Sequence, residues 1–253
     1  MIKNLNGKGE KRKAKKLEGK HIALVAMGQS QLDYHMSVTH SVEYDEVWAI
    51  NSMCSVVKTD RVFMMDPVSR FFDTDDAGPQ TEVMRKTLPT LECPVYSCEL
   101  DKRVPAIELY PLEKIIKDLG CAYFNNTIAY AIAFALWKKV GKFSIFGADF
   151  SYTTNVHFGE LGRACCEFWL SKCMDAGIDV SVAARSPMLD TSVALKEKLY
   201  GYHRLDNPPV VYLENGSLKV AKLSEVEAEE TPVGVSGRKD ISNGLGAPEP
   251  KNY

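Results

Sequence analysis

The chain has 253 residues, a formal net charge of -2 and 45% apolar residues. This composition is typical of a globular protein with a sizeable core. The longest apolar run, residues 128–137, is followed by Lys138 and Lys139 and falls short of the roughly 18 residues that span a bilayer. No signal-peptide pattern precedes the first apolar strand, so we expect a soluble, cytoplasmic protein.

Cysteine usage points to a reducing environment. The number of cysteines is odd, seven, their spacing is irregular, and several lie within apolar patterns. We therefore expect reduced, mostly buried thiols. Neither Cys93 with Cys98 nor Cys165 with Cys166 has the spacing of a zinc site, so we expect no metal bound by cysteine.

Residues 1–19 are rich in lysine, with five basic residues between positions 11 and 16. Such a segment can hold nucleic acid through its phosphates. A solvated, flexible arm explains the same composition, and we favour that interpretation because basic clusters are common at chain termini.

The first predicted strand, residues 21–27, runs into Gly28, Gln29 and Ser30. Glycine at this point permits a close approach of backbone, and Ser30 is expected to cap a helix that begins near Gln31. A strand, a glycine turn and a capped helix together suggest a phosphate site. A tight turn with a capping role fits equally well, because the pattern lacks the glycines of a dinucleotide motif and the lysine of a P-loop.

The next two predicted strands, residues 45–50 and 61–65, end in Asn51 and Asp66. Together with Ser30, three successive strands thus end in a polar residue. Open α/β sheets bind ligands along the carboxyl edge of their strands, so we expect these three side chains at one binding edge.

An acidic cluster of Asp73, Asp75 and Asp76 precedes a predicted helix over residues 80–87. Three carboxylates can hold a divalent cation together with a diphosphate. Acids at a helix start and in a solvated loop are the commoner explanation, and we favour it. The sequence therefore allows a bound magnesium ion but does not indicate one.

Asn125, Asn126 and Thr127 open a nearly all-apolar helix that extends to residue 137. Its alanines predict a buried helix in close packing. The free N–H groups of a helix start attract anions, so we expect a phosphate here.

A short apolar strand, residues 143–146, follows and stops at Gly147 and Asp149. A buried parallel strand that ends in glycine and then exposes an acid is typical of a ligand-binding edge. We expect Gly147 and Asp149 at the same edge as Ser30.

Beyond this strand, His157 precedes a predicted helix over residues 160–176, on which Glu160, Arg163 and Glu167 share one face. A histidine beside acids and an arginine can form a general-base site. A surface helix with an internal Glu-Arg pair is the alternative, and we favour the catalytic interpretation of His157 by a small margin.

A last strand, residues 178–183, is expected to bring Arg185 to the binding edge. Residues 200–204 are aromatic and basic, which suits either stacking on a base or packing of a lid. Two short strands, 210–213 and 217–221, flank an Asn-Gly turn and predict a hairpin. The expected organisation is an arm at 1–19, a catalytic domain at 20–206, the hairpin at 207–223 and a disordered tail at 224–253.

The order of these motifs resembles the bacterial sialyltransferase-type glycosyltransferases and the related domain of 6-hydroxymethylpterin pyrophosphokinase-like proteins. The motifs are Gly28 to Ser30, Asn51, Asn126 with Thr127, and Ile-Phe-Gly-Ala-Asp-Phe at 145–150, within residues 21–185. The family's first turn usually reads G-N-G-P-S, which Gly28 and Ser30 match and from which Ala26, Met27 and Gln29 depart. The strand and the later Gly-Arg-Ala-Cys-Cys-Glu-Phe-Trp-Leu also look like small members carried by bacteriophages.

The resemblance implies a Rossmann-like α/β fold, with a mostly parallel sheet and helices on both faces. It places Ser30, Asn51 and Thr127 near the nucleotide of an activated donor. It also implies a catalytic histidine after the Gly-x-Asp strand, for which His157 is the candidate, and a contact between Asp149 and the donor's ribose or sugar.

We therefore expect a glycosyltransferase that uses a nucleotide sugar as co-substrate and a hydroxyl acceptor. In a phage setting, the hypothesis for this acceptor is a DNA base, held through the basic arm. His157, Asp149 and Arg163 are the predicted catalytic residues, and Arg163 or Arg185 would stabilise the leaving phosphate. Two alternatives remain: diphosphoryl transfer from ATP with magnesium on the aspartates, and nucleotide binding without chemistry. The residues expected to hold the nucleotide are Gly28, Gln29, Ser30, Asn51, Asp66, Asn126, Thr127 and Gly147.

Overall fold

The structure is a computed structural model that divides into two compact units, Met1–Ser192 and Val193–Tyr253. The predicted tail beyond residue 226, the arm up to residue 15 and the segment Tyr202 to Arg204 lie outside the described residues. The described residues are 16–152, 155–193, 195, 198–201, 209–222 and 225–226.

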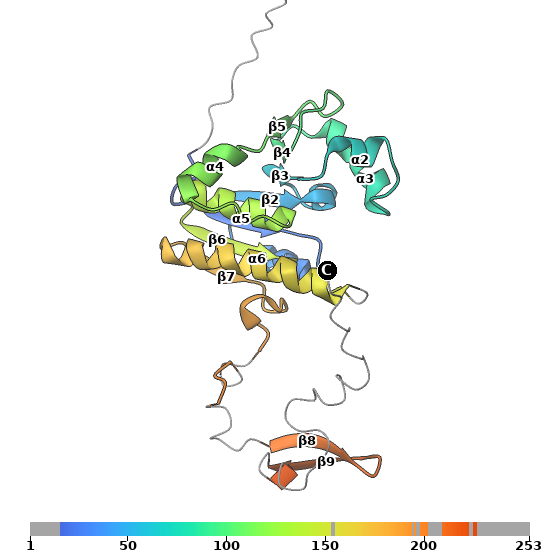
Figure 1. Cartoon of the computed structure of the whole chain (residues 1–253), viewed down its shortest axis with the longest axis vertical. Helices are drawn as coiled ribbons and strands as arrows, with labels where there is room; N and C mark the ends of the chain where they lie inside the picture. The colour runs from blue at the N-terminus through green and yellow to red at the C-terminus, as the bar shows by residue number, and fades with distance from the viewer. Residues whose placement is uncertain are drawn as a thin grey trace, which may run out of the picture. The chain divides into compact units, whose positions relative to one another are not determined.

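In the described part of the first unit, seven strands form one parallel sheet in the order β5-β4-β3-β2-β1-β6-β7 (Figure 1). The predicted α/β class, with a Rossmann-like parallel sheet, is confirmed. The strands are β1 (His21–Val25), β2 (Glu46–Ile50), β3 (Arg61–Phe63), β4 (Val95–Ser97), β5 (Ile107–Leu109), β6 (Lys142–Phe146) and β7 (Asp179–Val182).

The strand order reverses direction beside β1. Strands β1 to β5 follow one another in the sheet from β1 to one edge. Strand β6 then pairs with the other side of β1. Open α/β sheets bind ligands at such a switch point, outside the carboxyl ends of the strands. The topology therefore marks the end of β1 and β6 as the expected binding edge.

Side chains alternate along the strands into two cores, one on each face of the sheet. Ile22 and Leu24 of β1 pack with one group of helices, and Val25 packs with the other. The first face is covered by α4 (Leu112–Leu119), α5 (Thr127–Trp137) and α6 (Val156–Asp175), the second by η2 (Asn51–Ser55), α2 (Val68–Phe72), α3 (Gln80–Thr87), η3 (Leu88–Thr90) and, through Tyr34, α1 (Leu32–Thr39).

Helix α5 is buried along most of its length, as its alanine-rich sequence predicts. Four alanines, at 129, 131, 133 and 135, are fully buried, so the helix lies close to the sheet and to α6. In the described part of the chain, no helix is both long and apolar enough to cross a membrane.

Helix α6 begins four residues earlier than the sequence pattern predicted, at Val156 instead of Glu160. The reason is Asn155, whose side chain accepts a hydrogen bond from the Phe158 amide at 3.2 Å and so caps the helix. His157 and Phe158 therefore belong to the first helical turn. Strand β3 is also shorter than predicted and ends at Phe63.

In the second unit, β8 (Pro209–Glu214) and β9 (Ser217–Lys222) form the predicted antiparallel hairpin. Asn215 and Gly216 both have positive φ, 49° and 78°. Two such residues in sequence form the hairpin turn whose twist matches that of the strands.

Candidate functional site

A cleft of about 1050 Å³ lies along the carboxyl edge of the sheet, at the switch point. It is lined by residues that follow β1, β2, β3 and β6, by the start of α5 and by Arg185. All eight residues predicted to hold the nucleotide line it, as does Asp149. Its size is at the upper end of the range for small-molecule sites, roughly 300 to 1,000 Å³.

At the base of the cleft, the loop after β1 touches the loop after β6. The Ala26 amide donates to the Phe146 carbonyl at 2.8 Å, and the Gly28 amide donates to the Gly147 carbonyl at 2.7 Å. A Cβ on Gly28 would lie 2.6 Å from both the Gly147 carbonyl oxygen and Asp149 Oδ2. The glycine is therefore needed for this close approach of the two backbones.

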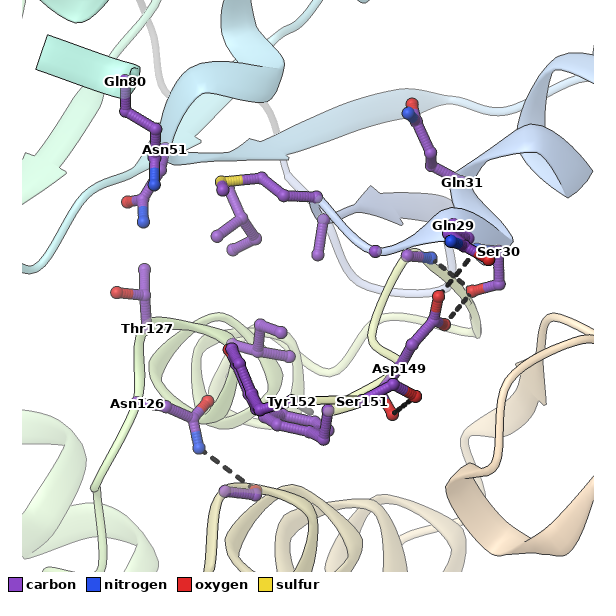
Figure 2. Close-up of a pocket in the computed structure, with 18 of the residues that line it drawn as sticks. Gln29, Ser30, Gln31, Asn51, Gln80, Asn126, Thr127, Asp149, Ser151 and Tyr152 are labelled. Carbon is purple, nitrogen blue, oxygen red and sulfur yellow. Dashed lines mark hydrogen bonds between the residues drawn. The ribbon is translucent and has the colours of Figure 1, made fainter. Parts of the chain in front are cut away.

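Ser30 and Asp149 join these two loops through hydrogen bonds (Figure 2). The Ser30 hydroxyl donates to Asp149 Oδ1, and the Ser30 amide donates to Asp149 Oδ2 at 2.8 Å. The Gly147 amide donates to the Ser30 hydroxyl at 2.8 Å. We call this arrangement the Ser30–Asp149 clamp.

The predicted capping role of Ser30 is wrong. The chain continues from Gly28 into a short 3-10 turn, η1 (Gln29–Gln31), and neither this turn nor α1 has a side-chain cap. The Ser30 hydroxyl is buried and faces Asp149 instead. The hydroxyl that the local sequence predicted to cap a helix thus bonds to Asp149, which lies 119 positions away in the sequence.

Replacing Ser30 with alanine is expected to lower the free energy of unfolding by about 1.5 to 3 kcal/mol, because a bond to a charged carboxylate is lost and the Gly147 amide loses its acceptor. Chemical denaturation of the full chain measures this change. Ser151→Ala is the matched control, because Ser151 is exposed and its hydroxyl bonds only at 3.3 Å. An equal change in both variants would contradict the clamp.

The start of α5 offers free N–H groups to the cleft. The first N–H groups of a helix lack intrahelical acceptors. Of these groups in α5, the Asn126 side chain accepts a hydrogen bond only from the Ala129 amide, at 3.0 Å. The amides of Thr127 and Ile128, which line the cleft, thus have no acceptor in the helix. Such a helix start favours an anion.

The side chain of Asn126 itself is used within the protein. Besides capping α5, its Nδ2 donates to the Gly162 carbonyl at 3.2 Å and to Asn125 Oδ1 at 2.7 Å. Asn126 therefore fixes the start of α5 against α6. The backbone amides of Thr127 and Ile128 are left as the donors that this turn offers to the cleft.

Three side-chain amide oxygens that belong to cleft-lining residues are buried and have no hydrogen-bond partner among the described residues. They are Gln31 Oε1, Asn51 Oδ1 and Gln80 Oε1, and Figure 2 shows all three side chains. A buried acceptor without a donor costs about 1 to 3 kcal/mol. Asn51 also has a positive φ of 48°, a conformation that is uncommon outside glycine.

Both arginines that line the cleft are paired with carboxylates. Arg70 donates to Asp66 at 2.6 Å and lies 3.3 Å from Asp76, and Arg185 lies 3.0 Å from Asp33. The hydrogen bond with Asp66 raises the pKa of Arg70. The charges of both arginines are therefore already partly neutralised by the protein's own carboxylates.

His157 and Arg163 are the two predicted catalytic residues that the structure does not bring into the cleft. His157 is exposed in the first turn of α6, and its neighbour Phe158 lines the cleft. Arg163 bonds to Glu167 and to Asp190, each at 2.8 Å. The bond with Glu167 raises the pKa of Arg163 and forms the Glu-Arg pair that the helical spacing indicated.

The acidic cluster after α2 is paired with arginines. Asp76 contacts Arg70, and the other two aspartates each contact one arginine, Asp73 with Arg103 and Asp75 with Arg85. Among the described residues, no three His, Cys, Asp or Glu side chains gather in a way that could hold a metal ion. These pairs agree with the interpretation of the cluster as loop charges.

The sequence did not single out several residues that line the cleft. Arg70 lies four residues after Asp66, a spacing that could have indicated it. Tyr152 and Phe158 form an aromatic pair at the cleft, with ring centroids 5.5 Å apart. Gln31 and Gln80 carry no local signal, because glutamine is common on exposed helix surfaces.

Comparisons of the chain with protein-family models, with curated proteins and with solved structures found no match. The functional assignment therefore depends on the site itself.

Proposed function

We propose that this chain is a glycosyltransferase that moves a sugar from a nucleotide-activated donor to a hydroxyl acceptor. The observation that carries the proposal is the position of the cleft, at the switch point of a parallel sheet and beside a helix start with free N–H groups. Nucleotides bind α/β sheets in this way. The volume of the cleft leaves room for an acceptor next to the donor.

In this proposal, the donor phosphate lies at the amides of Thr127 and Ile128, and Arg185, which lines the same cleft, stabilises the leaving phosphate. Asp149, held by Ser30, contacts the ribose or the transferred sugar. His157 lies beside the lining residue Phe158 and takes the acceptor proton as general base. The acceptor would enter past Tyr152 and Phe158, whose side chains are 47% and 50% exposed.

Diphosphoryl transfer from ATP is the less favoured enzymatic function. It would use the aspartates to hold magnesium, yet Asp66 is paired with Arg70, and Asp149 accepts two bonds from Ser30. The pairing of these carboxylates with the protein's own donors makes them less available to a metal ion, and so favours sugar transfer over diphosphoryl transfer.

Nucleotide binding without chemistry is the second candidate, and one observation favours it. The predicted general base, His157, is exposed and outside the lining of the cleft. A binding protein needs the cleft alone. A DNA acceptor, the basic arm and a cytoplasmic location are further proposals that rest on the sequence.

A panel of nucleotides and nucleotide sugars should reveal the donor through thermal stability. A ligand at 100 times its dissociation constant is expected to add about 2.7 kcal/mol to the free energy of unfolding. Incubation of the bound nucleotide sugar with candidate acceptors then separates the two candidates. Free nucleotide and glycosylated acceptor support the transferase, whereas intact donor supports the binding protein, and no stabilisation by any nucleotide contradicts both.

A further inference from the structure

Aromatic side chains line the cleft where the loop after β6 meets the start of α6. They belong to Phe150, Tyr152 and Phe158, and we call them the aromatic wall. Tyr152 and Phe158 pack edge to face, with ring centroids 5.5 Å apart and ring planes at 71°. In the view of Figure 2, Tyr152 lies between Asn126 at the start of α5 and Asp149. The aromatic wall therefore borders the part of the cleft assigned to the donor.

Two rings of the aromatic wall are open to solvent. All ten phenylalanines lie within the described residues, and Phe158 is the only one of them that is exposed. Tyr152 is exposed as well. A half-exposed aromatic ring leaves a large apolar surface in contact with water, and a ligand that covers this surface gains the free energy of removing it from water. Both rings are thus accessible to a ligand.

Two glycines of α6 make room for the aromatic wall. A Cβ on Gly162 would lie 2.7 Å from Cε1 of the Phe150 ring, and a Cβ on Gly159 would lie 3.2 Å from Cδ2 of the Tyr152 ring. Glycine weakens a helix, yet here it allows two rings to lie directly against the helix. The rings therefore have fixed places, and a preorganised surface loses little freedom when a ligand binds.

The polar side chains beside the aromatic wall are already bonded within the protein. Apart from the Tyr152 hydroxyl, the polar side chains among the described lining residues 149–162 are those of Asp149 and Ser151. Asp149 accepts two hydrogen bonds from Ser30, and the Ser151 hydroxyl donates to the Asp149 carbonyl at 3.3 Å. The two asparagines at the start of α5 donate to carbonyls of α6. A sugar acceptor would leave several hydroxyls without a partner here, so the wall favours an acceptor that is flat and mostly apolar.

We infer that the acceptor is an aromatic ring that carries a hydroxyl or hydroxymethyl group and stacks on Tyr152 and Phe158. A third ring can lie flat on one of these rings and edge-on to the other, which are the two arrangements that aromatic pairs prefer. This inference rests on the proposed function, because it assigns the acceptor class of the same cleft. In the transfer, the acceptor oxygen bonds to the anomeric carbon of the sugar, the bond from that carbon to the donor phosphate breaks, and the acceptor proton passes to His157.

Matched probes test the inference by ligand-observed NMR titration of the full chain. Benzyl alcohol and cyclohexylmethanol carry the same hydroxymethyl group, the first on an aromatic ring and the second on a saturated ring. We expect benzyl alcohol to bind about 3-fold to 10-fold more tightly than cyclohexylmethanol, and methyl glucoside to bind more weakly than benzyl alcohol. Hydroxymethyldeoxyuridine identifies the source of the ring: binding tighter than that of benzyl alcohol supports a modified nucleic-acid base, and weaker binding supports a small phenol-like compound.

Two variants remove one ring each and keep an apolar side chain. Phe158→Leu and Tyr152→Leu are each expected to reduce the preference for benzyl alcohol over cyclohexylmethanol to within about twofold. Tyr123→Leu is the matched control and should keep the preference, because Tyr123 is an exposed tyrosine that does not line the cleft. Affinity for the nucleotide found by the thermal panel should change by less than about twofold in all three variants. Thermal melts check that the variants are folded.

The outcomes separate this inference from the function on which it rests. Binding of methyl glucoside as tight as that of benzyl alcohol overturns the inference in favour of a sugar acceptor. A preference that survives both Phe158→Leu and Tyr152→Leu also overturns it. If these variants lose nucleotide binding and keep probe binding, the rings serve the donor and the inference is wrong. If the aromatic probe binds through both rings while no nucleotide binds, the aromatic site stands and the proposed transfer fails.

Discussion

Replacing Gly147 with alanine is expected to lower the free energy of unfolding by about 2 to 5 kcal/mol and the melting temperature by on the order of 10 °C. Gly147 has a φ of 72°, which costs an alanine about 1 to 2 kcal/mol. Its Cβ would also lie 2.0 Å from the Ala26 carbonyl oxygen. The two loops at the base of the cleft would have to separate, so nucleotide binding should weaken as well.

Gly120→Ala is the control that isolates the steric part of this effect. Gly120 ends α4 with nearly the same φ, 69°, but a Cβ there meets nothing within 4 Å. Gly120→Ala should lower the free energy of unfolding only by the about 1 to 2 kcal/mol that a left-handed alanine costs. Nucleotide binding should stay unchanged. If the two variants melt at the same temperature, the close contact between Gly147 and Ala26 adds nothing to the loss of stability in Gly147→Ala.

Replacing His157 with alanine is expected to reduce turnover by about 10² to 10⁴ if the histidine is the general base. Its side chain is exposed in the first turn of α6, so the melting temperature should stay within about 1 to 2 °C. Loss of activity without loss of stability is the signature of a catalytic role. Steady-state kinetics with the donor found by the thermal panel measure it.

Two further variants serve as comparisons for His157→Ala. His35→Ala changes another exposed histidine, on α1, and should retain full turnover. Asp149→Asn tests the acid within the cleft, and it should also destabilise the protein because the Ser30–Asp149 clamp is lost. If His157→Ala keeps full turnover while Asp149→Asn loses it at saturating donor, Asp149 is the better candidate for the base.

The sequence was sufficient to predict the sheet and the edge at which the site lies. The apolar runs of β1, β2 and β6 are short and end in glycine or a polar residue, and parallel strands necessarily bring such ends to one edge. For this reason Ser30, Asn51 and Asp149 could be expected near each other. The helices α3, α4 and α5 were predictable from their spacing and from the prolines before α3 and α4.

The sequence could not show which polar groups the protein itself uses. Ser30 is bonded to Asp149 and Asn126 to Gly162, and both contacts join segments far apart in the chain. The unpaired oxygens of Gln31 and Gln80 likewise depend on what surrounds them in the fold. Local propensity describes a residue's own backbone preference, and it carries no information on such tertiary neighbours.

The contact between the loops after β1 and β6 also has a consequence for the order of folding. The amides of Ala26 and Gly28 find their acceptors on Phe146 and Gly147, so the base of the cleft is missing until β6 docks beside β1. Closing a chain segment of this length is slow compared with forming a helix. During synthesis, a nascent chain that lacks β6 would have its first five strands available and still be unable to hold a ligand.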